Sequence, residues 1–183
     1  MRLALGTVQF GMNYGALDRP DDRVDATEVA AILDDADAAE IGLLDTARAY
    51  GESEAVLGTL AACRRFKIVS KIAPLASPAS VRQSFDASLA ALRTERLYAL
   101  LLHRAADLLG PDGPQIWSAM RDLRDDGLVE RIGVSVYTPE EADRIAQAFD
   151  ISIVQLPLSV FDQRGVSTGV IGKLDACGIE VHV

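Results

Sequence analysis

Short apolar runs alternate with longer segments of helical periodicity along the whole chain of 183 residues. The apolar runs predict seven strands, at Leu3–Val8, Ile41–Leu44, Ile68–Val69, Leu97–Leu102, Ile132–Val136, Ile151–Leu158 and Ile179–Val183. Several runs are continuous rather than alternating, which is typical of parallel strands that are covered on both faces. The pattern therefore predicts an α/β fold built from repeated strand–helix units.

The segments between the strands carry signals for helix ends. Thr138-Pro139-Glu140-Glu141 is a capping box with proline at the first helical position, and Ser77-Pro78 offers the same order of N-cap and proline. Gly127 follows an apolar stripe of helical spacing, where a left-handed residue commonly ends a helix. These signals predict helices that begin near residues 78 and 139 and one that ends near residue 126.

Strand–helix units that recur every 25 to 30 residues or so imply a parallel sheet with right-handed crossovers. Two architectures fit this description, an open doubly wound sheet and a closed (β/α)8 barrel. Length alone favours the open sheet, because a barrel typically needs about 250 residues. No linker or shift of composition divides the chain, so we expect a single domain over residues 1–183.

Charge and composition narrow the possible partners. The 18 Lys and Arg residues against 27 Asp and Glu residues give a net charge of −9, which argues against binding to nucleic acid. The chain shows no signal peptide and no apolar run long enough to span a membrane, so we expect a cytoplasmic protein. Cys63 and Cys177 lack a metal-binding spacing and are interpreted as core residues or free thiols, and no metal site is expected.

Four polar side chains follow the ends of three consecutive predicted strands. Asp45 and Tyr50 come after the second strand, Lys71 after the third, and His103 after the fourth. Each could have an ordinary structural role, as a helix cap, a rim aromatic, a solvated charge or a loop histidine. Because the carboxyl ends of parallel strands share one edge of a sheet, we expect the four groups to meet there as a proton-transfer cluster.

Around these residues the chain resembles a known family. The segments LALGTVQFGMNYG, GLLDTARAYGESEAVLG, VSKI, LLHR, RIGVSVYTPEEA and VQLPLSVFDQR are similar, in chain order, to aldo-keto reductases. The resemblance covers essentially the whole chain. It implies a (β/α)8 barrel, rather than an open sheet, that transfers hydride between NAD(P)H and the carbonyl group of an aldehyde, ketone or sugar.

The resemblance implies a catalytic tetrad of Asp45, Tyr50, Lys71 and His103. Tyr50 would be the general acid, and His103 would donate a hydrogen bond to the substrate oxygen. Lys71 would lower the pKa of the Tyr50 phenol through its positive charge. Asp45 would pair with Lys71 and limit the cost of a partly buried charge.

The resemblance also implies residues that bind the cofactor, NADPH or NADH. These residues are Gly6, Thr7, Asp45, Ser135 and Gln155. Ser135 and Gln155 would bind the nicotinamide carboxamide, which needs both a donor and an acceptor. Two further acids, Glu52 and Glu54, are interpreted as first-turn helix residues that complement the helix dipole.

The last segment, IEVHV, resembles the start of the family's seventh strand. The resemblance therefore predicts an incomplete barrel of about seven strands, truncated at the C-terminus, with impaired dinucleotide binding and open sheet edges that allow self-association. Two alternatives stay open. One is a non-catalytic remnant that associates through its strand edges. The other is an unrelated open α/β hydrolase that uses Asp45 and His103, although no GxSxG motif is present.

Overall fold

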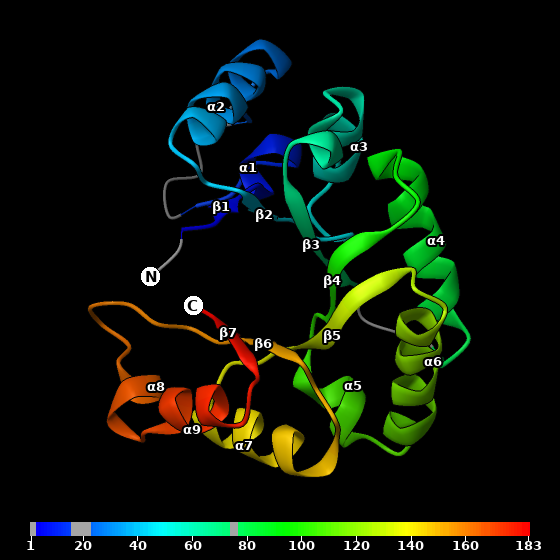
Figure 1. Ribbon diagram of the computed structural model, residues 1–183, viewed down its shortest axis with the longest axis vertical. Coiled ribbons are helices and arrows are strands. Elements are labelled where there is room, and N and C mark those ends of the chain that lie inside the picture. The colour runs from blue at the N-terminus through cyan, green and yellow to red at the C-terminus, as the bar shows by residue number, and fades with distance from the viewer. Residues whose placement is uncertain (1–2, 16–22, 74–76) are drawn as a thin grey trace. The chain divides into compact units, whose positions relative to one another are not determined.

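The computed structural model describes residues 3–15, 23–73 and 77–183. Strands and helices alternate along the chain (Figure 1). The strands are β1 (Leu5–Gly6), β2 (Leu43–Asp45), β3 (Lys67–Ile72), β4 (Leu97–Leu102), β5 (Val129–Ser135), β6 (Ile153–Gln155) and β7 (Glu180–His182). The helices are α1 (Val8–Gly11), α2 (Ala26–Ala38), α3 (Ser53–Thr59), α4 (Ser80–Leu92), α5 (Ala105–Leu109), α6 (Gly113–Asp125), α7 (Pro139–Ala148), α8 (Arg164–Ser167) and α9 (Val170–Ala176), with a short 3-10 turn, η1, at Ala62–Arg64.

The sheet confirms the predicted fold class. All seven predicted strands are present, and their order in the sheet is β1-β2-β3-β4-β5-β6-β7. The pairs β1–β2, β2–β3, β5–β6 and β6–β7 are parallel. A doubly wound sheet reverses its strand order at a switch point, whereas a barrel keeps chain order. The described residues therefore form an incomplete (β/α)8 barrel with seven strands.

Several strands are shorter than the apolar runs that predict them. Val8 belongs to α1 instead of the first strand, because the chain turns after Thr7 and the Phe10 N–H donates to the Thr7 carbonyl at 3.0 Å. The sixth run leaves the sheet after Gln155, since Pro157 has no N–H to continue the ladder. Apolar content thus marks the strands but not their ends.

Two of the three predicted helix ends are confirmed. Thr138 accepts a hydrogen bond from the Glu141 N–H, and the Glu141 carboxylate accepts one from the Thr138 N–H. Gly127 has a left-handed φ of 73° just after α6. The start predicted from Ser77-Pro78 is wrong by part of a turn. The Ser80 N–H bonds to the Ser77 carbonyl at 3.0 Å in a preceding turn, and α4 begins at Ser80.

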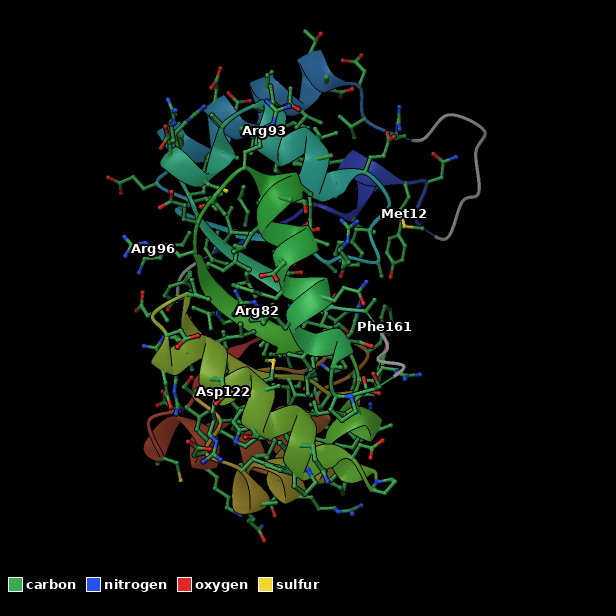
Figure 2. All side chains as sticks on the ribbon, turned by 90° about the vertical axis from the view of Figure 1, so that its right-hand side faces the viewer. Met12, Arg82, Arg93, Arg96, Asp122 and Phe161 are labelled. Carbon is green, nitrogen blue, oxygen red and sulfur yellow. The ribbon has the colours of Figure 1, made fainter. Side chains whose placement is uncertain are left out.

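The chain forms two compact units. The first unit contains Met1–Ala73 and Gln83–Tyr98, and the second contains Pro74–Arg82 and Ala99–Val183. Both α4 and β4 therefore contribute residues to both units. On α4, Arg82 is the last residue of the second unit, and Arg93, with a left-handed φ of 53°, follows the end of the helix (Figure 2). A single domain over residues 1–183 stays a prediction.

Each unit has its own buried contacts. In the first unit, α1 packs against α3. In the second, α6 packs against β5. The Trp117 and Phe149 rings meet edge to face, with 5.7 Å between their centroids. The Trp117 indole N–H donates to the Asp150 carboxylate at 2.6 Å. Neither cysteine is part of a core: both are free, Cys63 is half-buried and Cys177 is exposed. Within the described ranges, no helix is long and apolar enough to cross a membrane, and no group of three or more His, Cys, Asp or Glu side chains is placed to hold a metal ion.

Candidate active site

Lys71 is the most deeply buried charged group at the carboxyl ends of β2 and β3. Its side chain is 2% exposed, near the end of a strand whose residues from Ile68 to Ile72 are all buried. Asp45 is the last residue of β2 and lies in register with Val69, two residues before Lys71. The parallel pairing of two strands thus brings the carboxylate and the ammonium group to the same edge of the sheet.

The Lys71 ammonium group donates to oxygen atoms from two predicted site residues. Its Nζ atom lies 2.8 and 2.6 Å from the two carboxylate oxygens of Asp45, and 3.3 Å from the Thr46 carbonyl. It also lies 3.3 Å from the Tyr50 hydroxyl and 5.0 Å from the centre of the Tyr50 ring. The structure therefore brings Asp45, Tyr50 and Lys71 together, as the sequence predicts.

Burial and pairing act in opposite directions on Lys71. Removal from water disfavours the charged amine and lowers the pKa of Lys71 below its ordinary value of 10.5, and this effect dominates. The negative charge of Asp45 and its hydrogen bonds favour the charged form and offset part of the decrease. A buried charge without such a partner is strongly destabilising, so the pair behaves as one unit.

The backbone of the loop after β2 continues the ladder with β3. The Thr46 N–H donates to the Val69 carbonyl at 2.9 Å, and the Arg48 N–H donates to the Lys71 carbonyl at 3.0 Å. The Tyr50 N–H then closes a turn with the Ala47 carbonyl at 3.0 Å. These bonds hold the loop from Thr46 to Arg48 against β3. The turn that follows brings the Tyr50 ring over Lys71.

Three buried hydroxyl groups form a hydrogen-bonded cluster that joins this loop to Thr7 and to α3. Thr7, Thr46 and Ser53 are each fully buried. The Thr7 hydroxyl donates to the Asp45 carbonyl at 2.9 Å, and the Ser53 hydroxyl donates to Thr7 at 2.9 Å and lies 3.1 Å from the Thr46 hydroxyl. The Thr7 side chain thus ties β1 to the residue that pairs with Lys71. Its contact with a cofactor stays a prediction, as does that of the exposed Gly6.

A second buried cluster contains Glu54, whose burial the sequence pattern does not predict. The sequence predicts a first-turn acid at Glu54, and the residue does lie in the first turn of α3. Its side chain, however, is 1% exposed and accepts hydrogen bonds from Ser70 at 2.7 Å and from Arg48 at 2.9 Å. No local pattern marks this burial, because both partners of the carboxylate come from other parts of the chain. Glu52, by contrast, is exposed and pairs with Arg23.

The other predicted site residues belong to the second unit. His103 directly follows β4 and is half-buried. Ser135 and Gln155 are register partners at the carboxyl ends of β5 and β6, and both are half-buried. The Gln155 carbonyl accepts a hydrogen bond from the Val136 N–H at 2.8 Å. The approach of His103 to Tyr50 stays a prediction.

The sequence matches the model of the aldo/keto reductase family over residues 2–182. The chain belongs to the aldo/keto reductase family. Membership implies NAD(P)H-dependent reduction of small carbonyl compounds, and it agrees with the barrel order of the strands. Among curated proteins there is no match.

Solved aldo-keto reductases share the fold. PA4992 from Pseudomonas aeruginosa superposes with a TM-score of 0.84 at 28% identity, over 97% of this chain and 70% of its own. AKR11C1 from Bacillus halodurans, in its holo form, gives 0.81 at 20% identity, over 98% of this chain and 60% of its own. Aldose reductase from Giardia lamblia gives 0.73 at 19% identity, over 98% and 64%. The last two show the fold alone, and the chain spans 60 to 70% of the length of these three relatives.

Proposed function

We propose that this aldo-keto reductase transfers hydride between NAD(P)H and an aldehyde, ketone or sugar carbonyl, with Tyr50 as the general acid. The observation that carries the proposal is the ammonium group of Lys71, which is 2% exposed and lies within hydrogen-bond distance of both Asp45 and Tyr50. A buried ammonium beside a phenol favours the ionised phenol, which is what a tyrosine needs in order to give up its proton near neutral pH.

Each of the four proposed catalytic residues has a distinct task. Tyr50 holds the proton that reaches the carbonyl oxygen when its carbon is reduced. Lys71 stabilises the phenolate that is left, and Asp45 keeps Lys71 charged and in place through two hydrogen bonds of 2.8 and 2.6 Å. We assign to His103 the second donor to the substrate oxygen, which would orient the carbonyl and stabilise its developing negative charge.

The residues at the ends of β5 and β6 fit a nicotinamide carboxamide. Ser135 and Gln155 are register partners and half-exposed, and together they offer hydroxyl and amide donors and acceptors. The bound cofactor would supply the hydride itself. Gly6, Thr7 and Asp45 complete the set that we assign to the cofactor. The proposal covers NADPH and NADH alike, and it names small carbonyl compounds as the substrate class.

Replacement of Tyr50 by Phe tests the proposal. The Tyr50→Phe variant removes the acid and keeps the ring, so we expect NADPH binding to persist while reduction of 4-nitrobenzaldehyde falls at least about a hundredfold. NADPH binding is followed by nucleotide fluorescence and reduction by loss of NADPH absorbance. The control is Tyr14→Phe, because Tyr14 is 62% exposed and should leave the rate unchanged.

Two results would overturn the proposal. One is a wild-type chain that folds but neither binds a nicotinamide dinucleotide nor reduces any of a set of aldehydes, ketones and sugars. The other is a Tyr50→Phe variant as fast as the wild type. Because the chain spans 60 to 70% of the length of its solved relatives, dinucleotide affinity is measured separately from turnover.

A further inference from the structure

Glu54 is a charged residue that is buried behind the candidate site. It is 1% exposed, and both of its carboxylate oxygens are used: one accepts from the Ser70 hydroxyl at 2.7 Å and the other from the Arg48 guanidinium at 2.9 Å. An acid that only complemented a helix dipole could do so from the surface. Burial of a carboxylate is costly unless its partners compensate, so these two contacts need an explanation.

The two partners of Glu54 are neighbours of the proposed catalytic groups. Ser70 directly precedes Lys71 on β3, and Arg48 lies in the loop between Asp45 and Tyr50. Successive residues of a strand point to opposite faces, so Ser70 and Lys71 leave β3 on opposite sides. Glu54 is therefore attached to the back of the strand that presents Lys71 and to the loop that presents Tyr50.

The loop is held from two directions at Arg48. Its backbone N–H donates to the Lys71 carbonyl at 3.0 Å, and its guanidinium group pairs with Glu54. These bonds support the hydrogen bond between Lys71 and Tyr50. That hydrogen bond is long, since the Tyr50 hydroxyl lies 3.3 Å from the Lys71 Nζ atom. At that distance, a small outward shift of the loop would break the hydrogen bond.

We infer that Glu54 is a positioning residue, whose bonds to Arg48 and Ser70 hold the Tyr50 loop against β3 and so set the distance between the Tyr50 hydroxyl and the Lys71 ammonium group. The inference rests on the proposed function, because the distance matters to catalysis only if Tyr50 is the acid. Glu54 itself touches neither reacting group. It acts through the loop and through the strand.

The test follows the titration of Lys71 by NMR. The chain has three lysines, Lys67, Lys71 and Lys173, of which the first and last are exposed, so a protein labelled with 13C at the lysine ε-carbons gives a spectrum that is simple to assign. We compare the wild type, Glu54→Gln, Tyr50→Phe and the double variant. We expect Glu54→Gln to shift the Lys71 titration in the same direction as Tyr50→Phe, and to add nothing further in the Tyr50→Phe background.

Glu52→Gln is the matched control. It removes the same charge two positions earlier, but Glu52 is 69% exposed and pairs with Arg23 at 2.6 Å. We expect it to leave the Lys71 titration unchanged. In the aldehyde assay, Glu54→Gln should lower kcat about tenfold to a hundredfold, as small misplacements of a reacting group do, with little change in KM.

Two outcomes would overturn the inference. If Glu54→Gln folds and leaves the Lys71 titration at its wild-type position, Glu54 does not set the site. If it shifts the titration equally with and without the Tyr50 hydroxyl, Glu54 acts only by its charge through space. Should Glu54→Gln fail to fold, Arg48→Gln replaces it, since Arg48 is 38% exposed and its loss disturbs the core less. Its effect on the Lys71 titration must likewise disappear in the Tyr50→Phe background. The titration needs neither cofactor nor substrate, so its result is separate from that of the aldehyde assay.

Discussion

Lys71 is an amine in a position with almost no access to water, and its immediate neighbours decide how firmly it holds its proton. Burial lowers the pKa of Lys71, while the charge and hydrogen bonds of Asp45 raise it. The two effects have separate structural causes, a covered strand end and one carboxylate, and a substitution can remove one without the other. Asp45 is therefore the residue through which the protonation of the site can be tested.

We predict that Asp45→Asn lowers the pKa of Lys71 further. The amide keeps the size of the carboxylate but loses the negative charge that favours the ammonium form, so burial acts without that compensation. We therefore expect the Lys71 titration to move to lower pH. The measurement is the 13C-lysine titration, with Lys67 and Lys173 as internal references. A Lys71 titration that stays in place or moves to higher pH would contradict the prediction.

Sequence and structure agree at some residues and part at others for a physical reason. Asp45, Tyr50 and Lys71 could be predicted because strand-end positions follow from local apolar runs and parallel strands share an edge. The burial of Glu54 could not, because it depends on Ser70, 16 residues away, and on Arg48, whose side chain turns back toward the helix. His103 stays a prediction.

The elements of the first unit meet with very little clearance beside Tyr50. A Cβ atom on Gly11, the last residue of α1, would lie 1.9 Å from the Tyr50 carbonyl oxygen and 2.2 Å from the Ser53 nitrogen. Gly51 has a left-handed φ of 56°, and its Cβ would lie 2.5 Å from the Gly11 carbonyl oxygen. The end of α1 thus packs directly against the backbone between Tyr50 and α3.

We predict that Gly11→Ala destabilises the protein and displaces Tyr50. The added methyl group meets backbone that cannot rotate away, so the free energy of unfolding should fall by about 1–3 kcal/mol, as overpacking typically costs. Urea denaturation measures the change, and the aldehyde assay should show a loss of rate in the folded variant. Gly42→Ala is the control, since a Cβ there has open space around it. Equal free energies of unfolding for the two variants would contradict the close approach of Gly11 to the backbone of Tyr50 and Ser53.

The apolar runs predicted every strand but not every boundary. The run at Leu3–Val8 includes Val8, which belongs to α1, and α1 ends at Gly11 in close approach to Tyr50. That approach is a contact between segments some forty residues apart. A local pattern of apolar residues therefore identifies an element, whereas its ends are set by what the element touches.

At the scale of the whole molecule, the two compact units share elements that run from one into the other. Helix α4 and strand β4 each have some residues in the first unit and the others in the second. Disruption of either unit would therefore break a helix and a strand on which the other depends. This continuity argues that the units unfold together, in spite of their separate cores.

We predict a single unfolding transition. Trp117, the one tryptophan of the chain, reports on the second unit, and the labelled Lys71 reports on the first. Fluorescence and NMR followed across the same urea series should give coincident midpoints. Two separate midpoints would show that each unit unfolds by itself, and would also count against the expected single domain.

The choice between a barrel and an open sheet depends on the order of the strands in the sheet, which no local pattern of residues predicts. Both architectures share the same strand–helix periodicity, and length favoured the wrong one. The polar residues at the strand ends, and the resemblance that they carry, favour the barrel, and the observed strand order confirms it. Self-association stays a prediction, which sedimentation velocity over a range of protein concentrations can test.

The scarcity of lysine has a practical consequence for anyone who wishes to fix this protein to a support. Lys67 begins β3 and is exposed, and Lys71 lies four residues further along the same strand, about 13 Å away. Amine-reactive beads or dyes would thus attach at exposed amines such as those of Lys67 and Lys173, and be excluded from Lys71 by its burial. A molecule coupled through these exposed lysines keeps the buried Lys71 unmodified beside Asp45 and Tyr50.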